Sequence, residues 1–292
     1  MSALYQRQRA FQILLLLPAL LLLFTLTVYP LVDVIYHSFY DYDYIKGTKR
    51  FIGLENYHKL LGNRFFLRSV QNTVVFSVVA TAAEVLLGLG LALLLGWPFR
   101  GRRYVIPLMI FPMMISTMVV SAIWRAWFHY DFGFLNFVLR SLGLGGVRWL
   151  FDPDLALFSI VLVDVWQWTP LAFLILLAGL QSIPQELYEA ARVDGASGVS
   201  LFRHITLPLI RSHLLLATLL RTVDTFKLFD KVYALTGGGP GLATETISMH
   251  IYREGFKFFN LGAASAASVV MIGVVGALAA IYAWQILRRQ AQ

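Results

Sequence analysis

Long apolar stretches, separated by shorter polar ones, dominate this chain. A bilayer core about 30 Å thick is crossed by roughly 20 apolar residues of helix, so windows of that length with almost no charge predict membrane spans. Six such windows occur, at residues 11–32, 70–95, 104–127, 155–180, 208–227 and 262–287. The pattern predicts an all-α membrane protein. Its six-span transmembrane domain covers 11–287, between short termini at 1–10 and 288–292.

The basic residues orient these spans. An even number of spans puts both termini on one side of the membrane, and Lys and Arg gather in cytoplasmic loops. Their density is higher in the segments that lie inside when the termini are inside. The short segment 96–103 alone carries Arg100, Arg102 and Arg103 beside two spans. We therefore expect a multi-pass protein with both termini in the cytoplasm.

Composition narrows the class of protein further. The chain is 58% hydrophobic and 14% charged, whereas a soluble domain is typically about a quarter charged. It has no cysteine, which excludes disulfides, cysteine-ligated metal sites and thiol catalysis. The net charge of +8 comes from cations scattered over loop ends rather than gathered in a basic stripe. A cytoplasmic membrane face explains that charge better than nucleic-acid binding does.

Motifs for covalent chemistry are missing from the sequence. It contains no G-x-x-x-x-G-K-[ST] phosphate loop, no H-E-x-x-H zinc motif and no G-x-S-x-G nucleophile elbow. The chain therefore has no recognisable means of hydrolysing ATP, a peptide or an ester by itself, and we expect no catalytic residue, no metal and no cofactor bound by this chain. If transport is energised by ATP, the energy enters from another subunit.

The most informative stretch is residues 183–208, between the fourth and fifth predicted spans. Pro184 fits the start of a short helix, and Asp194-Gly195 supplies a break before a second short segment that ends near Pro208. This helix–kink–helix element is too polar to insert, yet a span tethers it at each end. It must therefore lie on the membrane face as an interfacial anchor, or in the groove of a partner protein.

The spacing within this segment resembles a known signature. Glu189-Ala190-Ala191, Gly195 and Ile205-x-Leu207-Pro208 match the EAA-x3-G-x9-I-x-LP pattern of the permease subunits of binding-protein-dependent ABC importers. Further stretches resemble the maltose-type carbohydrate permeases. They are IGLENYHKLL (52–61), WQWTP (166–170), LAGLQSIP (177–184) and LTGGGP (235–240). The resemblance runs from about residue 50 to the end of the last predicted span.

This resemblance implies a function and a set of partners. The chain would carry a sugar, polyol or sugar derivative across the bacterial cytoplasmic (inner) membrane by alternating access. It would work with a second homologous permease subunit, two ATP-binding subunits that use ATP and Mg²⁺, and a periplasmic or lipid-anchored solute-binding protein. Segment 183–208 would be the cytoplasmic coupling helix. Its ATPase-coupling residues would be Glu189, Ala190, Ala191, Asp194, Gly195, Ile205, Leu207 and Pro208. Asp194 could instead cap the second arm locally.

Polar residues inside the predicted spans are candidates for the solute path. Charges in a membrane are costly and usually face a cavity or one another, and sugars are held by aromatic faces together with polar groups. The candidates are Glu84, Asp164, Trp166, Gln167, Trp168, Arg221 and Asp224. Arg221 and Asp224 are spaced i,i+3 and could form a structural ion pair instead. The tryptophans could equally serve helix packing.

On the outer side, Gly237, Gly238, Gly239 and Pro240 form a turn after the fifth predicted span. The resemblance makes this surface a candidate docking site for the solute-binding protein. An ion-coupled secondary transporter is the alternative function, and it would need no ATPase. A membrane-embedded enzyme would need convergent catalytic residues, for which only Glu84 and Asp164 are candidates.

Overall fold

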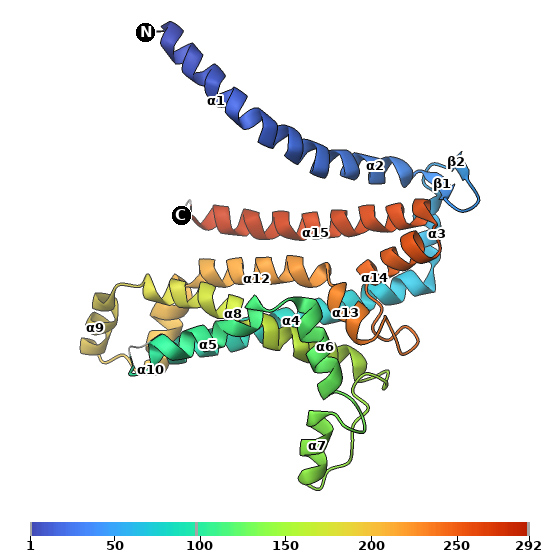
Figure 1. The fold of residues 1–292 in the computed structure, drawn as a ribbon. Helices are drawn as coiled ribbons and strands as arrows, with labels where there is room; N and C mark the ends of the chain where they lie inside the picture. The colour runs from blue at the N-terminus through green and yellow to red at the C-terminus, as the bar shows by residue number, and fades with distance from the viewer. Residues whose placement is uncertain (1, 97–98, 291–292) are drawn as a thin grey trace. The chain divides into compact units, whose positions relative to one another are not determined.

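The computed structural model describes residues 2–96 and 99–290, and it is almost entirely helical (Figure 1). Parts of three predicted segments, the termini 1–10 and 288–292 and the loop 96–103, therefore lie outside the described residues. Two compact units make up the chain. The first combines residues 1–63 with 251–272, and the second combines 64–250 with 273–292.

The first unit begins with an apolar helical stretch. The part of this stretch that is long and apolar enough to cross a membrane is Ile13–His37. Its most apolar residues are not buried by the rest of the protein, as expected for a helix surrounded by lipid. The elements of this unit are α1 (Ser2–Leu23), the π-helical turn η1 (Phe24–Val28), α2 (Tyr29–His37), β1 (Tyr40–Asp43), β2 (Thr48–Phe51), α3 (Glu55–Gly62), the π-helical turn η3 (Arg253–Lys257) and the first turns of α15 (Leu261–Gln290).

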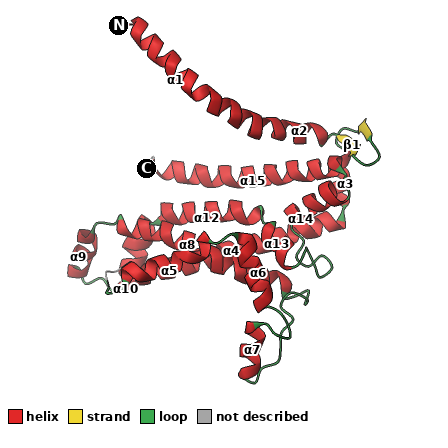
Figure 2. Cartoon of the chain, viewed as in Figure 1, coloured by secondary structure: helices red, strands yellow, loops and turns green. Residues whose placement is uncertain are grey.

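A small hairpin is the feature of this unit that sequence analysis did not predict. Strands β1 and β2 pair antiparallel, with Tyr40 opposite Phe51, and are the only strands among the described residues (Figure 2). The carboxylate of Asp43 accepts the amide protons of Ile45 and Lys46 at 3.0 Å each and so closes the turn. The side chain of Lys46 also hydrogen-bonds this carboxylate and lowers its pKa below the usual value.

The second unit is a bundle built on two long helices, α4 and α8, which pack along each other. Its elements are α4 (Arg64–Leu95), α5 (Arg102–Met114), α6 (Thr117–Trp127), α7 (Phe134–Ser141), α8 (Ala156–Gln181), α9 (Gln185–Val193), α10 (Gly198–Leu201), the π-helical turn η2 (Phe202–Thr206), α11 (Leu207–Leu209), α12 (Arg211–Phe226), α13 (Asp230–Leu235), most of α14 (Ile247–Tyr252) and the rest of α15.

Small residues bring α4 and α8 together. A Cβ at Gly88 would lie 2.8 Å from the backbone nitrogen of Phe173 and 2.9 Å from the Cβ of Ala172. Ala92, Phe173 and Leu176 are fully buried beside this contact. Close backbone approach through small residues is the usual way in which helices pack within a membrane.

The helices account for most of the predicted spans. Among the described residues, four are long and apolar enough to cross a membrane: Ile13–His37, Arg64–Leu95, Ala156–Gln181 and Leu261–Gln285. The predicted fifth span corresponds to α12, which has only 16 residues. The helical membrane fold is therefore established, and the count of six spans stays a prediction.

The predicted third span, 104–127, is broken rather than continuous. Helices α5 and α6 meet at 94°, because Ile115 is extended and Ser116 leaves helical geometry before α6 begins. The break leaves the carbonyl of Ile115 without a helical partner. The side-chain amide of Gln167, on α8, donates to this carbonyl at 3.0 Å and so satisfies it.

Candidate functional site

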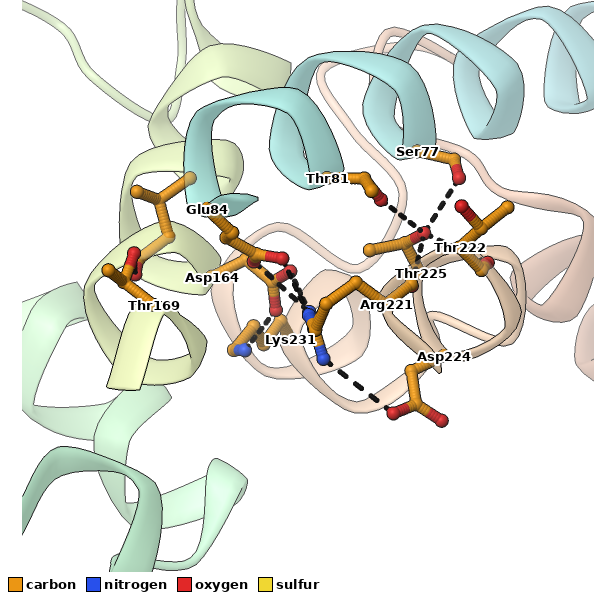
Figure 3. Close-up of polar contacts among 11 residues, drawn as sticks. Ser77, Thr81, Glu84, Asp164, Thr169, Arg221, Thr222, Asp224, Thr225 and Lys231 are labelled. Carbon is orange, nitrogen blue, oxygen red and sulfur yellow. Dashed lines mark hydrogen bonds and ion pairs between the residues drawn. The ribbon is translucent and has the colours of Figure 1, made fainter. Parts of the chain in front are cut away.

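Four buried charged side chains from four helices meet inside the second unit (Figure 3). The guanidinium of Arg221, on α12, donates to Glu84 of α4 at 2.5 and 3.0 Å, and to Asp164 of α8 at 3.0 Å. The ammonium of Lys231, on α13, donates to the other oxygen of Asp164. We call Glu84, Asp164, Arg221 and Lys231 the charge cluster. None of the four is more than 2% exposed.

The charge cluster satisfies itself electrostatically. Two carboxylates face two cations, so the buried charge sums to zero. Bringing each ion out of water costs several kcal/mol, a cost that close pairing offsets. The geometry therefore fixes four helices relative to one another through a single connected network.

The rim of the charge cluster is polar and accessible. Asp224 lies 3.6 Å from Arg221 and 3.5 Å from Lys227, and its side chain is 49% exposed. The ring of Trp168 lies 5.1 Å from the guanidinium of Arg221 and 5.9 Å from the ammonium of Lys231, within the range of cation–π attraction. An aromatic face and a half-exposed carboxylate therefore stand beside fixed positive charges.

The structure brings together three of the residues that sequence analysis picked as path candidates, Glu84, Asp164 and Arg221. It adds Lys231, which sequence analysis missed because this residue lies beyond the predicted end of the fifth span. The signal was a lysine inside the apolar run LFDKVYAL, 228–235. Asp224 does pair with Arg221, as the i,i+3 spacing suggested.

The three remaining path candidates lie on α8 but in different surroundings. Gln167 is fully buried at the break between α5 and α6. Trp166 is 38% exposed, and its ring packs edge-on against Trp124 at 5.7 Å. Only Trp168 reaches the charge cluster.

The predicted coupling segment has the shape that its sequence indicated. Helix α9 ends at Val193, and Gly195 follows in the left-handed region with φ +81°, where other residues are strained. Glu189, Ala190, Asp194 and Gly195 are exposed. Their side chains or backbone therefore face outward from this segment.

The second arm of the segment is α10, η2 and α11. Its N-terminus is capped by Ser197, whose hydroxyl accepts the amide proton of Ser200, so the local cap is Ser197 rather than Asp194. A hydrogen bond of 3.0 Å joins the hydroxyls of Tyr188 and Thr206 and ties the two arms together. Three predicted coupling residues lie on this arm: Ile205 in η2, and Leu207 and Pro208 in α11. The remaining one, Ala191, is half-buried and lies on the first arm, in α9.

The glycine-rich turn at residues 237–240 is well anchored. Gly237 and Gly238 have positive φ angles of 63° and 94°. The hydroxyl of Thr244 donates to the carbonyl of Gly239, just before Pro240, at 2.7 Å. The side-chain amide of Asn72, on α4, donates to the carbonyls of Leu242 and Glu245. The turn 237–240 is therefore a shaped surface fixed to α4.

No group of three or more His, Cys, Asp or Glu side chains among the described residues is arranged to hold a metal ion. The charge cluster, with equal numbers of cations and carboxylates, has no surplus negative charge for one.

Comparison with known proteins identifies relatives of this chain. Residues 84–290 match the family described as the inner membrane component of binding-protein-dependent transport systems. The trehalose/maltose transport system permease protein MalF of Thermococcus litoralis is 40% identical over 272 residues, which cover 93% of this chain and 90% of the relative. The sulfoquinovosyl glycerol transport system permease protein SmoG of Agrobacterium fabrum is 37% identical, covering 94% and 89%.

A solved structure shares the fold. A chain of a bacterial ABC transporter for the import of alginate superposes with a TM-score of 0.84, at 21% identity and 99% coverage of both chains. The fold and the sequence match agree with one another. The chain belongs to the family of binding-protein-dependent transport system inner membrane components, as a permease subunit of an ABC importer.

Proposed function

We propose that this permease subunit imports a sugar, polyol or sugar derivative by alternating access, with both termini in the cytoplasm and ATP hydrolysed in separate subunits. The observation that carries the proposal is the exposed, bent segment 183–208 between two helices of the bundle. The relatives support the solute class. They are named for trehalose/maltose, sulfoquinovosyl glycerol and sn-glycerol-3-phosphate, all of which are polyhydroxylated or derived from polyols.

The segment 183–208 transmits motion. The ATPase subunit can move the permease only by pushing on a stiff element that sits in a cleft on the ATPase surface. A short helix joined to a span at each end is such an element. The exposed face of α9, with Glu189 and Ala190, contacts the ATPase. The bend at Gly195 and the Tyr188–Thr206 hydrogen bond keep the two arms at a constant angle, so that a push on α9 moves α8 and α12.

The solute passes beside the charge cluster. Its hydroxyls meet the half-exposed carboxylate of Asp224, and its C–H faces stack on the tryptophan rings of the path, Trp168 above all. Glu84, Asp164 and Arg221 hold the wall in place because they already satisfy one another. A second homologous permease subunit completes the path, and the solute-binding protein docks at the outer turn 237–240.

Purification of the chain from native membranes in mild detergent tests this proposal. Mass spectrometry of the preparation should identify two different permease subunits and an ATP-binding subunit, and its ATPase activity should rise when the solute-loaded binding protein is added. The ligand that co-purifies with the binding protein should be a sugar, polyol or derivative. A chain that purifies alone and still transports would instead support an ion-coupled secondary transporter.

A further inference from the structure

A cavity of about 560 Å³ lies in the second unit, and residues of the coupling segment form part of its wall. Its walls come from the ends of α4 and α8, the beginning of α5, helix α9 and the second arm of the segment. It is separate from the charge cluster, with which it shares no lining residue. The proposed function uses two of its lining residues, Tyr188 and Thr206, to join the two arms, but assigns no ligand to the cavity.

The charged side chains that line this cavity are both basic. Arg102, from the first turn of α5, and Arg192, from α9, both line it. Among the described residues that line the cavity there is no aspartate or glutamate. Within the described part of the chain, the buried Nε of Arg102 has no hydrogen-bond partner. A buried guanidinium nitrogen without a partner carries a desolvation cost that an anion would remove.

The other walls make the cavity amphipathic. Tyr188, Gln185 and Gln181 add neutral polar groups to the lining. Leu93, Leu180 and other apolar side chains form the remaining lining. Such a lining suits a molecule that carries both an anionic group and an apolar body.

We propose that this cavity binds a phosphate group, held by the guanidinium groups of Arg102 and Arg192. Arginine offers several N–H donors in a planar fork that matches phosphate oxygens. Basic pockets between spans at the cytoplasmic side are the sites where the head groups of anionic lipids bind. The apolar lining favours the phosphate of an anionic phospholipid over a free organic phosphate, which shares the same chemistry.

A bound phosphate has a mechanical consequence. Arg192 belongs to the coupling helix, whereas Arg102 belongs to α5, so one anion would join the moving segment to the bundle. We expect an occupied cavity to stiffen that junction and raise the ATPase activity that the binding protein stimulates. This consequence, and the assignment of the cavity to the cytoplasmic side, rest on the proposed function; the binding itself does not.

Binding is measured by native mass spectrometry of the purified complex in detergent, titrated with dioleoylphosphatidylglycerol in one arm and with inorganic phosphate in the other. The wild type should retain phosphatidylglycerol. Arg102→Gln and, separately, Arg192→Gln should each weaken its binding about tenfold, the effect of losing one charge-assisted contact. Arg102→Lys, which keeps the charge, should recover part of the affinity. Binding of inorganic phosphate without phosphatidylglycerol would assign the cavity to a soluble anion.

Arg103→Gln is the matched control. Arg103 is the next residue in sequence, is exposed, and bonds to the hydroxyl of Tyr104 at 2.6 Å rather than lining this cavity. The Arg103→Gln substitution makes the same change in net charge as the other two and should leave the binding of phosphatidylglycerol unchanged. Failure of the wild type to bind either probe would overturn the proposal, and so would equal binding by wild type, Arg102→Gln and Arg192→Gln. The ATPase subunit detected in the same spectra reports on the proposed function independently.

Discussion

Arg221 contacts both carboxylates of the charge cluster, so its removal has the clearest consequence at the scale of single residues. Arg221→Met keeps much of the length of the side chain but leaves Glu84 buried with no cation, while Asp164 keeps Lys231. A buried charge that loses its partner costs about 3–5 kcal/mol. We expect the free energy of unfolding to fall by about that amount, measured by thermal or denaturant unfolding of the purified subunit in detergent.

Asp224→Asn is the control for this prediction. Asp224 also pairs with Arg221, but at 3.6 Å and from a side chain that is half exposed, where an ion pair contributes about 0–1 kcal/mol. The double variant Glu84→Leu with Arg221→Met should regain much of the loss, because it removes both charges. Equal effects of Arg221→Met and Asp224→Asn would show that the cluster is not the stabilising network described above.

Single residues also show what sequence can and cannot predict. Glu84, Asp164 and Arg221 stood out because charge is rare inside apolar windows. Their pairing was not predictable, because 137 residues separate Glu84 from Arg221 and no local sequence pattern indicates a contact between residues so far apart. Lys231 was missed because only residues within the predicted spans were searched for buried charge.

At the scale of helices, the contact between α4 and α8 depends on Gly88. Gly88→Ala would place a Cβ 2.8 Å from the backbone of Phe173, and overpacking of this kind costs about 1–3 kcal/mol. Gly90→Ala, two residues away on the same helix, would meet nothing within 4 Å. We expect a lower unfolding temperature for Gly88→Ala alone, and a Gly90→Ala temperature equal to or above that of the wild type. The reverse order would contradict the packing.

The bend of the coupling segment gives a second prediction at this scale. Gly195→Pro fixes φ near −65° where the structure has +81°, and it removes the amide proton donated to Arg192. Solute uptake should be lost while the subunit still inserts and assembles. Uptake by membrane vesicles and the yield of assembled complex are the two measurements.

Gly143→Pro is its matched control. Gly143 has a φ of +78° and donates its amide proton to Arg140, so the same backbone change is made in the loop between the third and fourth predicted spans. Uptake by this variant should stay close to the wild-type rate. Normal uptake by Gly195→Pro, or equal loss in both variants, would argue against coupling through 183–208.

Helices were predictable where apolar length alone decides. The window at 155–180 matches α8 to within one residue at each end, whereas α4 ends as predicted at residue 95 but begins at Arg64 rather than at residue 70. The break between α5 and α6 was not predictable, because it depends on the amide of Gln167 reaching a carbonyl 52 residues away. The hairpin of β1 and β2 depends on a side-chain turn at Asp43, a signal too short to separate from an ordinary polar loop.

For the whole molecule, composition and loop spacing predicted the class of protein. Low charge predicted a membrane protein, and the spacing from Glu189 to Pro208 resembles the signature of ABC importer permeases. The match to family relatives confirmed that assignment. The site inside the bundle needed three-dimensional structure, because its residues come from four helices that are distant in sequence.

We propose that the chain moves solute only when an ATPase drives it through the coupling segment, residues 183–208. Uptake of radiolabelled solute by proteoliposomes that contain the purified complex, with ATP enclosed and the solute-loaded binding protein outside, tests this claim most directly. We predict uptake that requires ATP, is lost in Gly195→Pro, and persists when an ionophore collapses ion gradients. Uptake by the permease chain alone that the ionophore abolishes would contradict the account.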